Sequence, residues 1–334
     1  MKVFLSHVPD MRANYYGERA LSALREVADV RLNERDVVLG GAALAKAAAG
    51  CDVIVADRMT PGTAETFAEA PDLVAFLRCA VDVSTIDLAA ASRHGVLVTH
   101  ATPGFAAAVA EIGLGYMIDL SRGISRSVLA YRAGTLPEAH MGRQLAGSCI
   151  GIVGYGEIGR RLAGLAAALG MRVLVSDPYA RVEDGYCEPV TMDVLLAQSD
   201  YVVCLALATP ETENLFGQAA FGRMKPGAFF INLSRGQLVD EDALIAALDA
   251  GVIQGAAMDV GRAPDQKPSP ELARRPDVIA TPHTGGLTPG AVEHQAFDTV
   301  EQVRALGEGR LPKGSLNAEA ATRLERLGIR SPAA

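Results

Sequence analysis

The sequence predicts an α/β protein made of two doubly wound, parallel-sheet domains. Short runs rich in β-branched residues alternate with helical patterns along most of the chain. The expected strands are almost continuously apolar, as is typical of parallel sheets that helices cover on both faces. With 334 residues the chain is also longer than one ordinary hydrophobic core requires, which favours two domains.

The expected elements follow this alternation in order. Five expected strands precede residue 100, around residues 3–5, 30–32, 53–55, 73–77 and 96–98. Helical patterns lie between them at residues 17–27, 42–49, 63–70 and 86–94. Six further strands are expected at 149–153, 172–176, 201–205, 228–232, 254–258 and 278–280. The segment 101–147 shows no clear strand and is expected to be helical. Apolar residues at helical spacing over 288–306 predict a helix that returns to the first domain.

Composition and charge exclude several classes of protein. Hydrophobic residues make up 49% of the chain and charged residues 21%, as in a soluble globular protein. The net charge of −8, without a cluster of Lys or Arg, argues against nucleic acid or an anionic membrane as a partner. The first residues do not resemble a signal peptide, and the five cysteines are scattered without a CxxC pair. We therefore expect a cytoplasmic protein with reduced thiols and no metal site.

A glycine-rich motif follows the expected strand 149–153. It reads Gly154, Tyr155, Gly156, Glu157, Ile158, Gly159 and leads into a helical pattern. Gly154 permits a tight turn, Gly156 lets a pyrophosphate approach the helix N-terminus, and Gly159 lets helix and strand pack closely. Asp177 ends the next expected strand, near the spacing of about 20 residues at which an acidic side chain accepts hydrogen bonds from both ribose hydroxyls. Such a carboxylate repels a 2′-phosphate, so the sequence predicts NAD rather than NADP.

Two polar residues follow later strands of the same expected sheet. Arg235 stands in "INLSRG", and His283 stands between Pro282 and two glycines in "TPHTGG". Ligands of open parallel sheets bind at the carboxyl ends of strands, where an Arg suits a carboxylate and a His suits proton transfer. From these motifs alone, a surface ion pair for Arg235 and a half-exposed turn residue for His283 remain open alternatives.

Taken together, the motifs resemble a known family. Nearly the whole chain is similar to the D-isomer-specific 2-hydroxyacid dehydrogenases, through "AVAEIGLGYMIDLSR", "GRQLAGSCIGIVGYGEIGRRLAGLAAALGMRVLVSDPY", "MKPGAFFINLSRGQLVDEDALIAAL", "GAAMDV" and "TPHTGG". The resemblance implies an NAD-binding Rossmann domain, residues 100–286, inserted into a flavodoxin-like substrate domain of residues 1–99 and 287–334. It also implies a homodimer whose face lies within 101–147.

The resemblance assigns roles to individual residues. It implies that Arg235 holds the carboxylate and carbonyl of a 2-oxoacid, and that His283 exchanges a proton with the carbonyl oxygen of a D-2-hydroxyacid pair. It implies that Asp259 contacts the nicotinamide end of NAD. Further residues of the cofactor groove would be Leu207, Thr212, Leu233 and Ser234.

The chain departs from the family pattern in two places on the substrate side. The glycine-type loop for the substrate carboxylate reads Cys79-Ala80-Val81-Asp82-Val83, and His100 stands where the family has Asn. We therefore expect Val81, Asp82 and His100 to contact an unusual substrate, although His100 is equally compatible with a solvated strand end.

A third departure concerns the catalytic His. The family's Glu partner is replaced at Ala263, so Asp265 or Gln266 would have to orient His283. Asp265 is favoured because a carboxylate supports both orientation and charge, and Arg262 adds a positive charge for a doubly charged substrate. The alternative to an NAD-dependent dehydrogenase is an NAD-responsive regulatory protein on the same scaffold. The sequence names neither the substrate nor the preferred direction.

Overall fold

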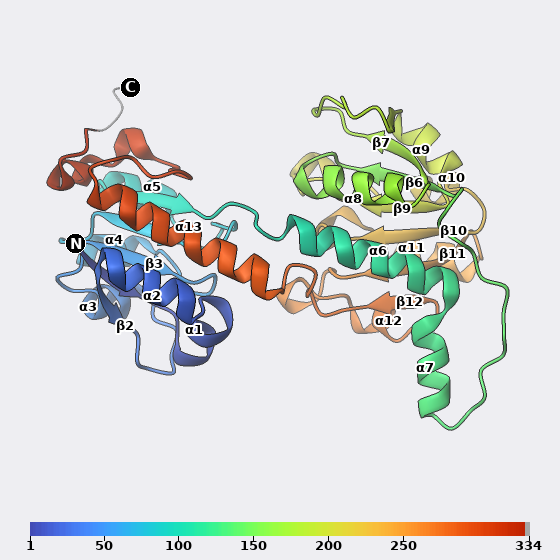
Figure 1. Ribbon diagram of the computed structural model, residues 1–334, viewed down its shortest axis with the longest axis horizontal. Coiled ribbons are helices and arrows are strands. Elements are labelled where there is room, and N and C mark those ends of the chain that lie inside the picture. Colours follow the sequence, from blue (N-terminus) through green and yellow to red (C-terminus); the bar gives the residue numbers. More distant parts are fainter. Residues whose placement is uncertain (331–334) are drawn as a thin grey trace. The chain divides into compact units, whose positions relative to one another are not determined.

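A computed structural model describes residues 1–330 of the chain, which forms two compact α/β units. One unit comprises Met1–Gly104 and the chain from Thr288 onward, and the other comprises Phe105–Leu287. Each unit contains one sheet with parallel strands throughout (Figure 1). These observations confirm the predicted fold class. Within residues 1–330, no helix is both long and apolar enough to span a bilayer.

The first unit has a five-stranded sheet in the order β2-β1-β3-β4-β5, which is the flavodoxin-like order. Its strands are β1 (Lys2–Leu5), β2 (Asp29–Leu32), β3 (Val53–Ala56), β4 (Ala75–Arg78) and β5 (Leu97–His100). Its helices are α1 (Pro9–Tyr15), α2 (Glu18–Val27), α3 (Gly41–Ala47), α4 (Ala64–Glu69), α5 (Leu88–Arg93) and α13 (Pro289–Gly307). The expected strands and helices of this part are all present, with ends shifted by a few residues.

The core of the first unit is assembled from both ends of the chain. Helix α13 packs against α2, and its buried Val300 and Val303 lie in one cluster with Val3 and Leu24. The side chain of Asn317 adds polar links, because it donates to Val96 O at 2.9 Å and accepts from Val98 N at 2.8 Å. One face of the sheet therefore remains incomplete until the C-terminal segment is in place.

The second unit has a seven-stranded sheet in the order β12-β11-β10-β9-β6-β7-β8. Its strands are β6 (Cys149–Val153), β7 (Arg172–Ser176), β8 (Cys187–Pro189), β9 (Tyr201–Cys204), β10 (Ala228–Asn232), β11 (Ile253–Met258) and β12 (Val278–Ala280). The chain leaves β6 on one side to β7 and later returns on its other side with β9. The carboxyl end of β6 is therefore a topological switch point, where ligands of such sheets bind.

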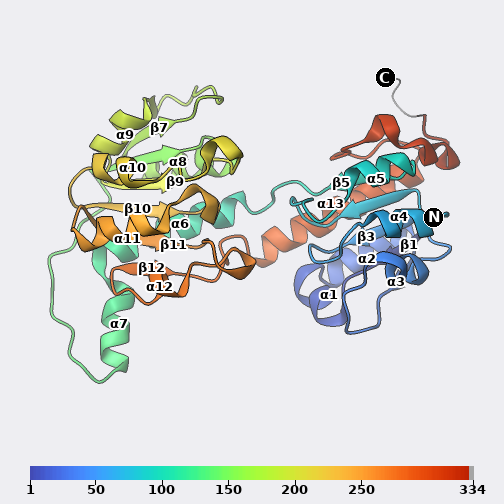
Figure 2. The same ribbon diagram turned by 180° about the vertical axis from the view of Figure 1, so that it is seen from behind.

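Helices cover both faces of this second sheet. On one face lie α6 (Ala106–Arg122) and α8 (Glu157–Ala168), which pack against each other, while α7 (Ile124–Arg132) follows α6 (Figure 1). The other face carries α9 (Met192–Gln198), α10 (Gln218–Arg223), α11 (Glu241–Asp249) and α12 (Pro270–Ala273), as Figure 2 shows from behind. The predicted helical segment 101–147 thus contains α6 and α7 and no strand.

One strand was absent from the sequence prediction. β8 has only three residues, Cys187, Glu188 and Pro189, and it pairs with β7 alone at the edge of the sheet. An edge strand can include Pro and a charged side chain because one side needs no ladder hydrogen bonds. Its composition therefore gives no apolar or β-branched signal.

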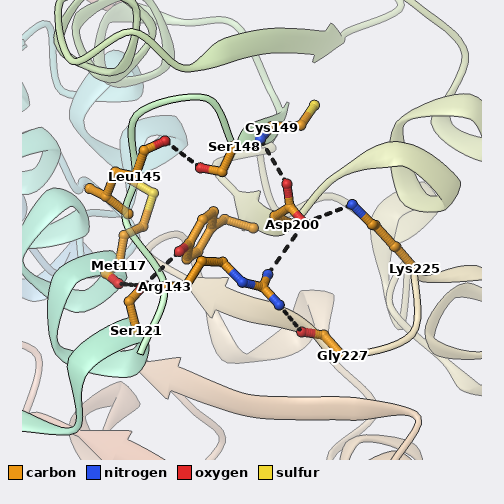
Figure 3. A network of polar contacts seen from close by, with 10 residues as sticks. Met117, Ser121, Arg143, Leu145, Ser148, Cys149, Asp200, Lys225 and Gly227 are labelled. Atoms are coloured by element: carbon orange, nitrogen blue, oxygen red, sulfur yellow. Dashed lines mark hydrogen bonds and ion pairs between the residues drawn. The ribbon is translucent and has the colours of Figure 1, made fainter. Parts of the chain in front are cut away.

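A polar network joins the amino-terminal edge of this sheet to the segment after α7 (Figure 3). Asp200, just before β9, accepts from Lys225 Nζ at 2.8 Å, from Arg143 at 3.3 Å and from the backbone N–H of Cys149 at 2.9 Å. Arg143 also donates to Gly227 O at 3.3 Å. One carboxylate with only 14% of its side chain exposed therefore ties three segments together.

This network makes stability depend on the charge of Asp200. Burial alone raises the pKa of this carboxyl, but the Lys225 and Cys149 hydrogen bonds and the nearby cations outweigh burial and lower it. A carboxyl whose folded pKa lies below the unfolded value of about 3.9 stabilises the fold above that pH, and this stabilisation is lost as the pH falls through the folded pKa.

Asp200→Asn should therefore lower the free energy of unfolding by about 2 kcal/mol at neutral pH and flatten its decline in acid. Urea unfolding between about pH 7 and about pH 2 measures both effects. The matched control is Asp193→Asn. Asp193 forms an ion pair with Arg223, and the two side chains are 67% and 59% exposed, so this variant should lose less than about 1 kcal/mol of the free energy of unfolding. Equal losses in the two variants would contradict a special role for Asp200.

Candidate functional site

The glycine motif lies at the switch point, between the end of β6 and the start of α8. Gly154 has φ 102°, and a Cβ there would lie 2.5 Å from the carbonyl carbon of Leu205. Gly156 is the N-cap of α8, and a Cβ there would meet no atom within 4 Å. Gly156 has no side chain with which to cap this helix, so the first amides of α8 are left for another acceptor. The arrangement fits a pyrophosphate at a helix N-terminus.

The other residues of the motif fix the loop. Gly159 packs on the backbone of Gly154, where a Cβ would lie 2.3 Å from its carbonyl oxygen, and Ile158 is half-buried in the core under α8. Glu157 is exposed in the first turn of α8. Its carboxylate therefore lies at the same helix end at which an anion would bind.

Asp177 follows β7 and is held by three backbone amides. Its carboxylate accepts from Tyr155 N at 2.7 Å, Tyr179 N at 2.8 Å and Ala180 N at 2.9 Å. Burial alone raises its pKa, but these hydrogen bonds and the charge of Arg160 outweigh burial and lower it. Asp177 is therefore ionised at neutral pH. About one of its four acceptor positions remains open.

The side chain of Tyr155 connects the glycine motif with the loop before β8. It is fully buried, donates to Asp184 Oδ2 at 2.5 Å and lies 3.2 Å from Cys187 Sγ. The guanidinium of Arg160 lies 4.8 Å from the centre of its ring. The sequence predicted Tyr155 only as a member of the glycine motif, because the position of Asp184 depends on tertiary structure.

The residues expected to line the cofactor groove follow β9 and β10. Leu207 is 79% exposed, and the hydroxyl of Thr212 donates to its carbonyl at 2.7 Å. Leu233 is buried and packs on α6 at Gly113. The Ser234 hydroxyl donates to Ala206 O at 2.5 Å, so it joins the two loops.

Arg235 lies after β10 in a backbone fixed by Asn232. The amide of Asn232 donates to Arg235 O at 2.9 Å, and its oxygen accepts from Ser234 N at 3.0 Å. Arg235 is half-buried, and its Nη1 donates to Ser234 O at 2.8 Å. Asn232 is fully buried and was not identified from the sequence, although it stands in the same "INLSRG" motif.

Asp259 follows β11 and is 3% exposed. Its carboxylate accepts from the backbone N–H groups of Thr284 and Gly285, both at 2.8 Å, and from the Thr281 hydroxyl. These three residues surround His283 in the turn after β12. The buried carboxylate therefore anchors the turn that carries the imidazole.

His283 itself has a left-handed backbone conformation, with φ 59°. Its N–H donates to Thr281 O at 2.9 Å, and its half-buried ring places Nδ1 3.5 Å from the backbone carbonyl of Asp265. The Asp265 carboxylate lies 3.6 Å from Lys267 Nζ. Asp265 and Gln266 also have positive φ, 59° and 55°, and Gln266 Oε1 is buried without a hydrogen-bond partner within residues 1–330.

The side chain of Arg262 joins neighbouring loop segments. Its Nη2 donates to Glu213 at 2.8 Å, Asn214 at 2.6 Å and Gln237 O at 2.9 Å, while its Nε donates to Val239 O at 3.1 Å. These acceptors engage the guanidinium in a link between loops.

Three predicted substrate residues lie in the first unit, whereas the residues just described belong to the second unit. Val81 and Asp82 follow β4, where the exposed Asp82 accepts from Ser84 N at 2.9 Å. His100 ends β5, and its Nδ1 lies 2.9 Å from Ala101 O. The second unit by itself brings together the glycine motif, Asp177, Arg235, Asp259 and His283 at the carboxyl edge of one sheet.

Comparisons with known proteins identify the scaffold. Residues 114–285 match the family model described as "D-isomer specific 2-hydroxyacid dehydrogenase, NAD binding domain". The hydroxypyruvate reductase of Thermotoga maritima is 30% identical over 258 residues, which are 75% of this chain and 83% of that protein. The chain belongs to the D-isomer-specific 2-hydroxyacid dehydrogenase family. Membership confirms the predicted resemblance, and it confirms NAD as the cofactor of the second unit.

Other relatives of this dehydrogenase family differ in length. D-3-phosphoglycerate dehydrogenase 2 of Arabidopsis thaliana, a chloroplastic protein, is 32% identical over 307 residues, which are 90% of this chain and 49% of that protein. The chain thus spans about half the length of such curated relatives. The solved D-lactate dehydrogenase of Escherichia coli has a TM-score of 0.77 at 25% identity, over 95% of this chain and 100% of that one. The relatives are named as enzymes, so the alternative of a regulatory protein gains no support.

Asp177 is expected to make this family member prefer NADH over NADPH by about 100-fold in affinity, because a 2′-phosphate would face an ionised carboxylate at short range. Asp177→Asn removes the charge and should reduce the preference to about tenfold or less. Calorimetric titration of each variant with both cofactors measures it. Glu183→Gln is the control, since that carboxylate is 68% exposed and pairs with Arg181. Equal affinities for the two cofactors in the unmodified protein would contradict the role of Asp177.

Proposed function

We propose that the chain is an NAD-dependent oxidoreductase that interconverts a 2-oxoacid and a D-2-hydroxyacid. The observation that carries this proposal is the order of strands at one edge of the second sheet. β10, β11 and β12 are neighbours, and Arg235, Asp259 and His283 follow their carboxyl ends. The glycine motif and Asp177 follow β6 and β7 at the same edge. A cationic fork and an imidazole thus stand beside a dinucleotide site.

The proposed roles follow from the chemistry of these groups. The planar guanidinium of Arg235 binds the substrate carboxylate and orients the neighbouring carbonyl. His283 donates a proton to that carbonyl oxygen during reduction and removes it during oxidation. NADH, when bound, supplies the hydride. Asp259 holds the turn that carries His283. The acceptor positions of its carboxylate that internal hydrogen bonds do not use would face the nicotinamide end of NAD.

The ring of His283 needs a fixed orientation for this proton transfer. The carbonyl of Asp265 accepts only, so a hydrogen bond to it requires a proton on Nδ1 and leaves Nε2 for the substrate. We assign the orienting role to this carbonyl, with the side chains of Asp265 and Gln266 as alternative partners. Asp265 and Gln266 both have left-handed backbone conformations, and this local backbone places the Asp265 carbonyl near Nδ1 of His283. The placement of the carbonyl supports the assignment.

For the cofactor, we propose that Asp177 accepts one ribose hydroxyl rather than two, since three backbone amides already use its other acceptor positions. The pyrophosphate would bind at Gly156 and the start of α8. Leu207, Thr212, Leu233 and Ser234 would line the rest of the groove.

The first unit, residues 1–99 and 287–334 in the sequence prediction, is proposed as the substrate domain, and residues 100–286 as the cofactor domain. Val81, Asp82 and His100 would then select the substrate, and a 2-oxoacid with an amine or hydroxyl group fits the charge of Asp82 better than a plain short one. The cytoplasm is the proposed location.

A homodimer is proposed through the face of α6, α7 and the segment after them. Large apolar side chains are exposed there at Ile118, Ile124, Val128, Leu129, Tyr131, Leu136 and Met141. Contiguous apolar patches of this kind mark interaction surfaces.

The proposal is tested by mixing the protein with NADH and each member of a panel of 2-oxoacids. Oxidation of NADH is followed as the loss of absorbance at about 340 nm, at rates on the order of micromolar cofactor per minute. Turnover of at least one 2-oxoacid, with the D-hydroxyacid as product on a chiral column, is the expected result. NADH binding without turnover across a panel that includes amino- and hydroxy-substituted 2-oxoacids would overturn it. If pyruvate and glyoxylate proved the best substrates, only the proposed selectivity of the first unit would fail.

A further inference from the structure

The side chain of Tyr116 reaches the turn of His283 from another element. Tyr116 belongs to α6, is 5% exposed and lies under the carboxyl edge of the sheet. Its hydroxyl contacts Thr281 Oγ1 and lies 3.5 Å from Asp259 Oδ1. Tyr116 lies within the stretch "AVAEIGLGYMIDLSR", but the sequence predicted no role for it, because the contact joins positions far apart in the chain.

The hydrogen bonds of this group have a defined direction. The Thr281 hydroxyl has one proton, which it donates to Asp259. The hydroxyl of Tyr116 must therefore be the donor toward Thr281. Burial raises the pKa of Tyr116, so the phenol keeps its proton at neutral pH and above. Tyr116, Thr281 and Asp259 thus form a directed chain, in which each bond strengthens the next.

This chain stabilises a backbone that would otherwise be unfavourable. A non-glycine residue in the left-handed region costs about 1 to 2 kcal/mol, and His283 has φ 59°. Hydrogen bonds to Asp259 on both sides of His283 fix the turn in that conformation. Gly285 allows the close approach, because a Cβ there would lie 2.8 Å from Asp259 Oδ2.

We infer that Tyr116 is a positioning residue that holds His283 in its proton-transfer conformation through Thr281 and Asp259. The inference rests on the proposed function for the role of His283. Tyr116 does not touch the reacting atoms in this view. Tyr116 orders the turn that carries His283, and His283 is the residue that exchanges the proton with the substrate.

Tyr116→Phe removes one oxygen and tests the inference. Loss of a hydrogen bond worth about 1 kcal/mol should lower kcat for 2-oxoacid reduction about fivefold, with little change in KM. Thr281→Val should give a similar loss, and Thr281→Ser, which keeps the hydroxyl, should restore most of kcat. Because both residues act in one chain, the double variant Tyr116→Phe/Thr281→Val should lose little more than either single variant. Losses that multiply would overturn the inference.

Tyr201→Phe is the matched control. Tyr201 is also a buried tyrosine of the second unit, and its hydroxyl contacts Ser121 Oγ at 2.6 Å. Removal of that hydroxyl should lower the melting temperature to a similar extent but leave kcat unchanged. An equal fall of kcat in Tyr201→Phe would show that lost stability, rather than positioning, explains the effect of Tyr116→Phe.

A second measurement does not need the enzymatic activity. The Cε1–H resonance of His283, assigned by its loss in His283→Gln, should shift by the same amount in Tyr116→Phe and Thr281→Val and stay unchanged in Tyr201→Phe. Unchanged spectra in the first two variants would overturn the inference. If these spectra shift while no 2-oxoacid is reduced by the unmodified protein, the proposed function fails and the positioning role stands.

Discussion

His283→Gln is expected to lower kcat/KM for 2-oxoacid reduction by about 1,000-fold, within the range of about 10²–10⁴ typical for general acid catalysis. Glutamine can donate a hydrogen bond to the carbonyl oxygen but cannot transfer a proton to it near neutrality. Reduction by the unmodified enzyme should fall as the pH rises and imidazolium is lost, and oxidation should rise with it. The variant should lose both pH dependences. Steady-state kinetics across pH, with calorimetry of NADH binding, measure these effects.

The control for this variant is His94→Gln. His94 follows α5 in the first unit, so it stands in no proposed site, and its replacement should leave kcat/KM unchanged. Binding of NADH should stay within about twofold in both variants, because neither changes the glycine motif or Asp177. A loss below about tenfold in His283→Gln would contradict its role as the proton donor.

Arg235→Lys is expected to lower kcat/KM by about 100-fold, the second largest effect. Two charge-assisted hydrogen bonds in a planar fork would become a single point contact, and hydrogen bonds to charged groups contribute about 1.5 to 3 kcal/mol each. The ammonium keeps the charge, so the loss measures geometry rather than net charge. Since Arg235 binds the substrate before and during the reaction, KM should rise while kcat falls.

Arg223→Lys is the matched control, since this arginine at the end of α10 forms an exposed ion pair with Asp193 of α9 and should tolerate the exchange. Melting temperatures of the two lysine variants separate misfolding from lost binding. If Arg235→Lys retained the kinetics of the unmodified enzyme, Arg235 would not belong to the substrate site.

The features that sequence predicted well are those encoded by neighbouring residues. The strand–glycine–helix unit around Gly154 and the acidic end of β7 are contiguous patterns, and the structure places both at the switch point of the second sheet. The apolar face of 288–306 likewise predicted a helix, found as α13. Local periodicity determines such elements because each must bury one face.

Features that depend on tertiary contacts were not predictable. Tyr116 reaches Thr281 from a helix far earlier in the chain, and the apolar spacing of α6 marks it only as a core residue. Asp265 was predicted as the partner of His283 through its carboxylate, and the folded chain also brings its backbone carbonyl to 3.5 Å from Nδ1 of His283, where two successive residues have positive φ. Arg262 was predicted as a substrate contact from its charge alone. Its acceptors come from two other segments, residues 213–214 and 237–239, which only the folded chain brings together.

The assembly of the first unit from both chain ends has a consequence for biosynthesis. Domains generally fold as units while the ribosome adds about 5–20 residues per second, usually with the N-terminal one first. Here the second unit is one unbroken stretch, so its whole sequence emerges before α13 exists. The later-encoded unit can complete its fold first, while one apolar face of the N-terminal sheet is covered by α2 but not yet by α13. Apolar surface exposed at this stage of synthesis favours aggregation, so the partly made first unit is the stage at which we expect misfolding to begin.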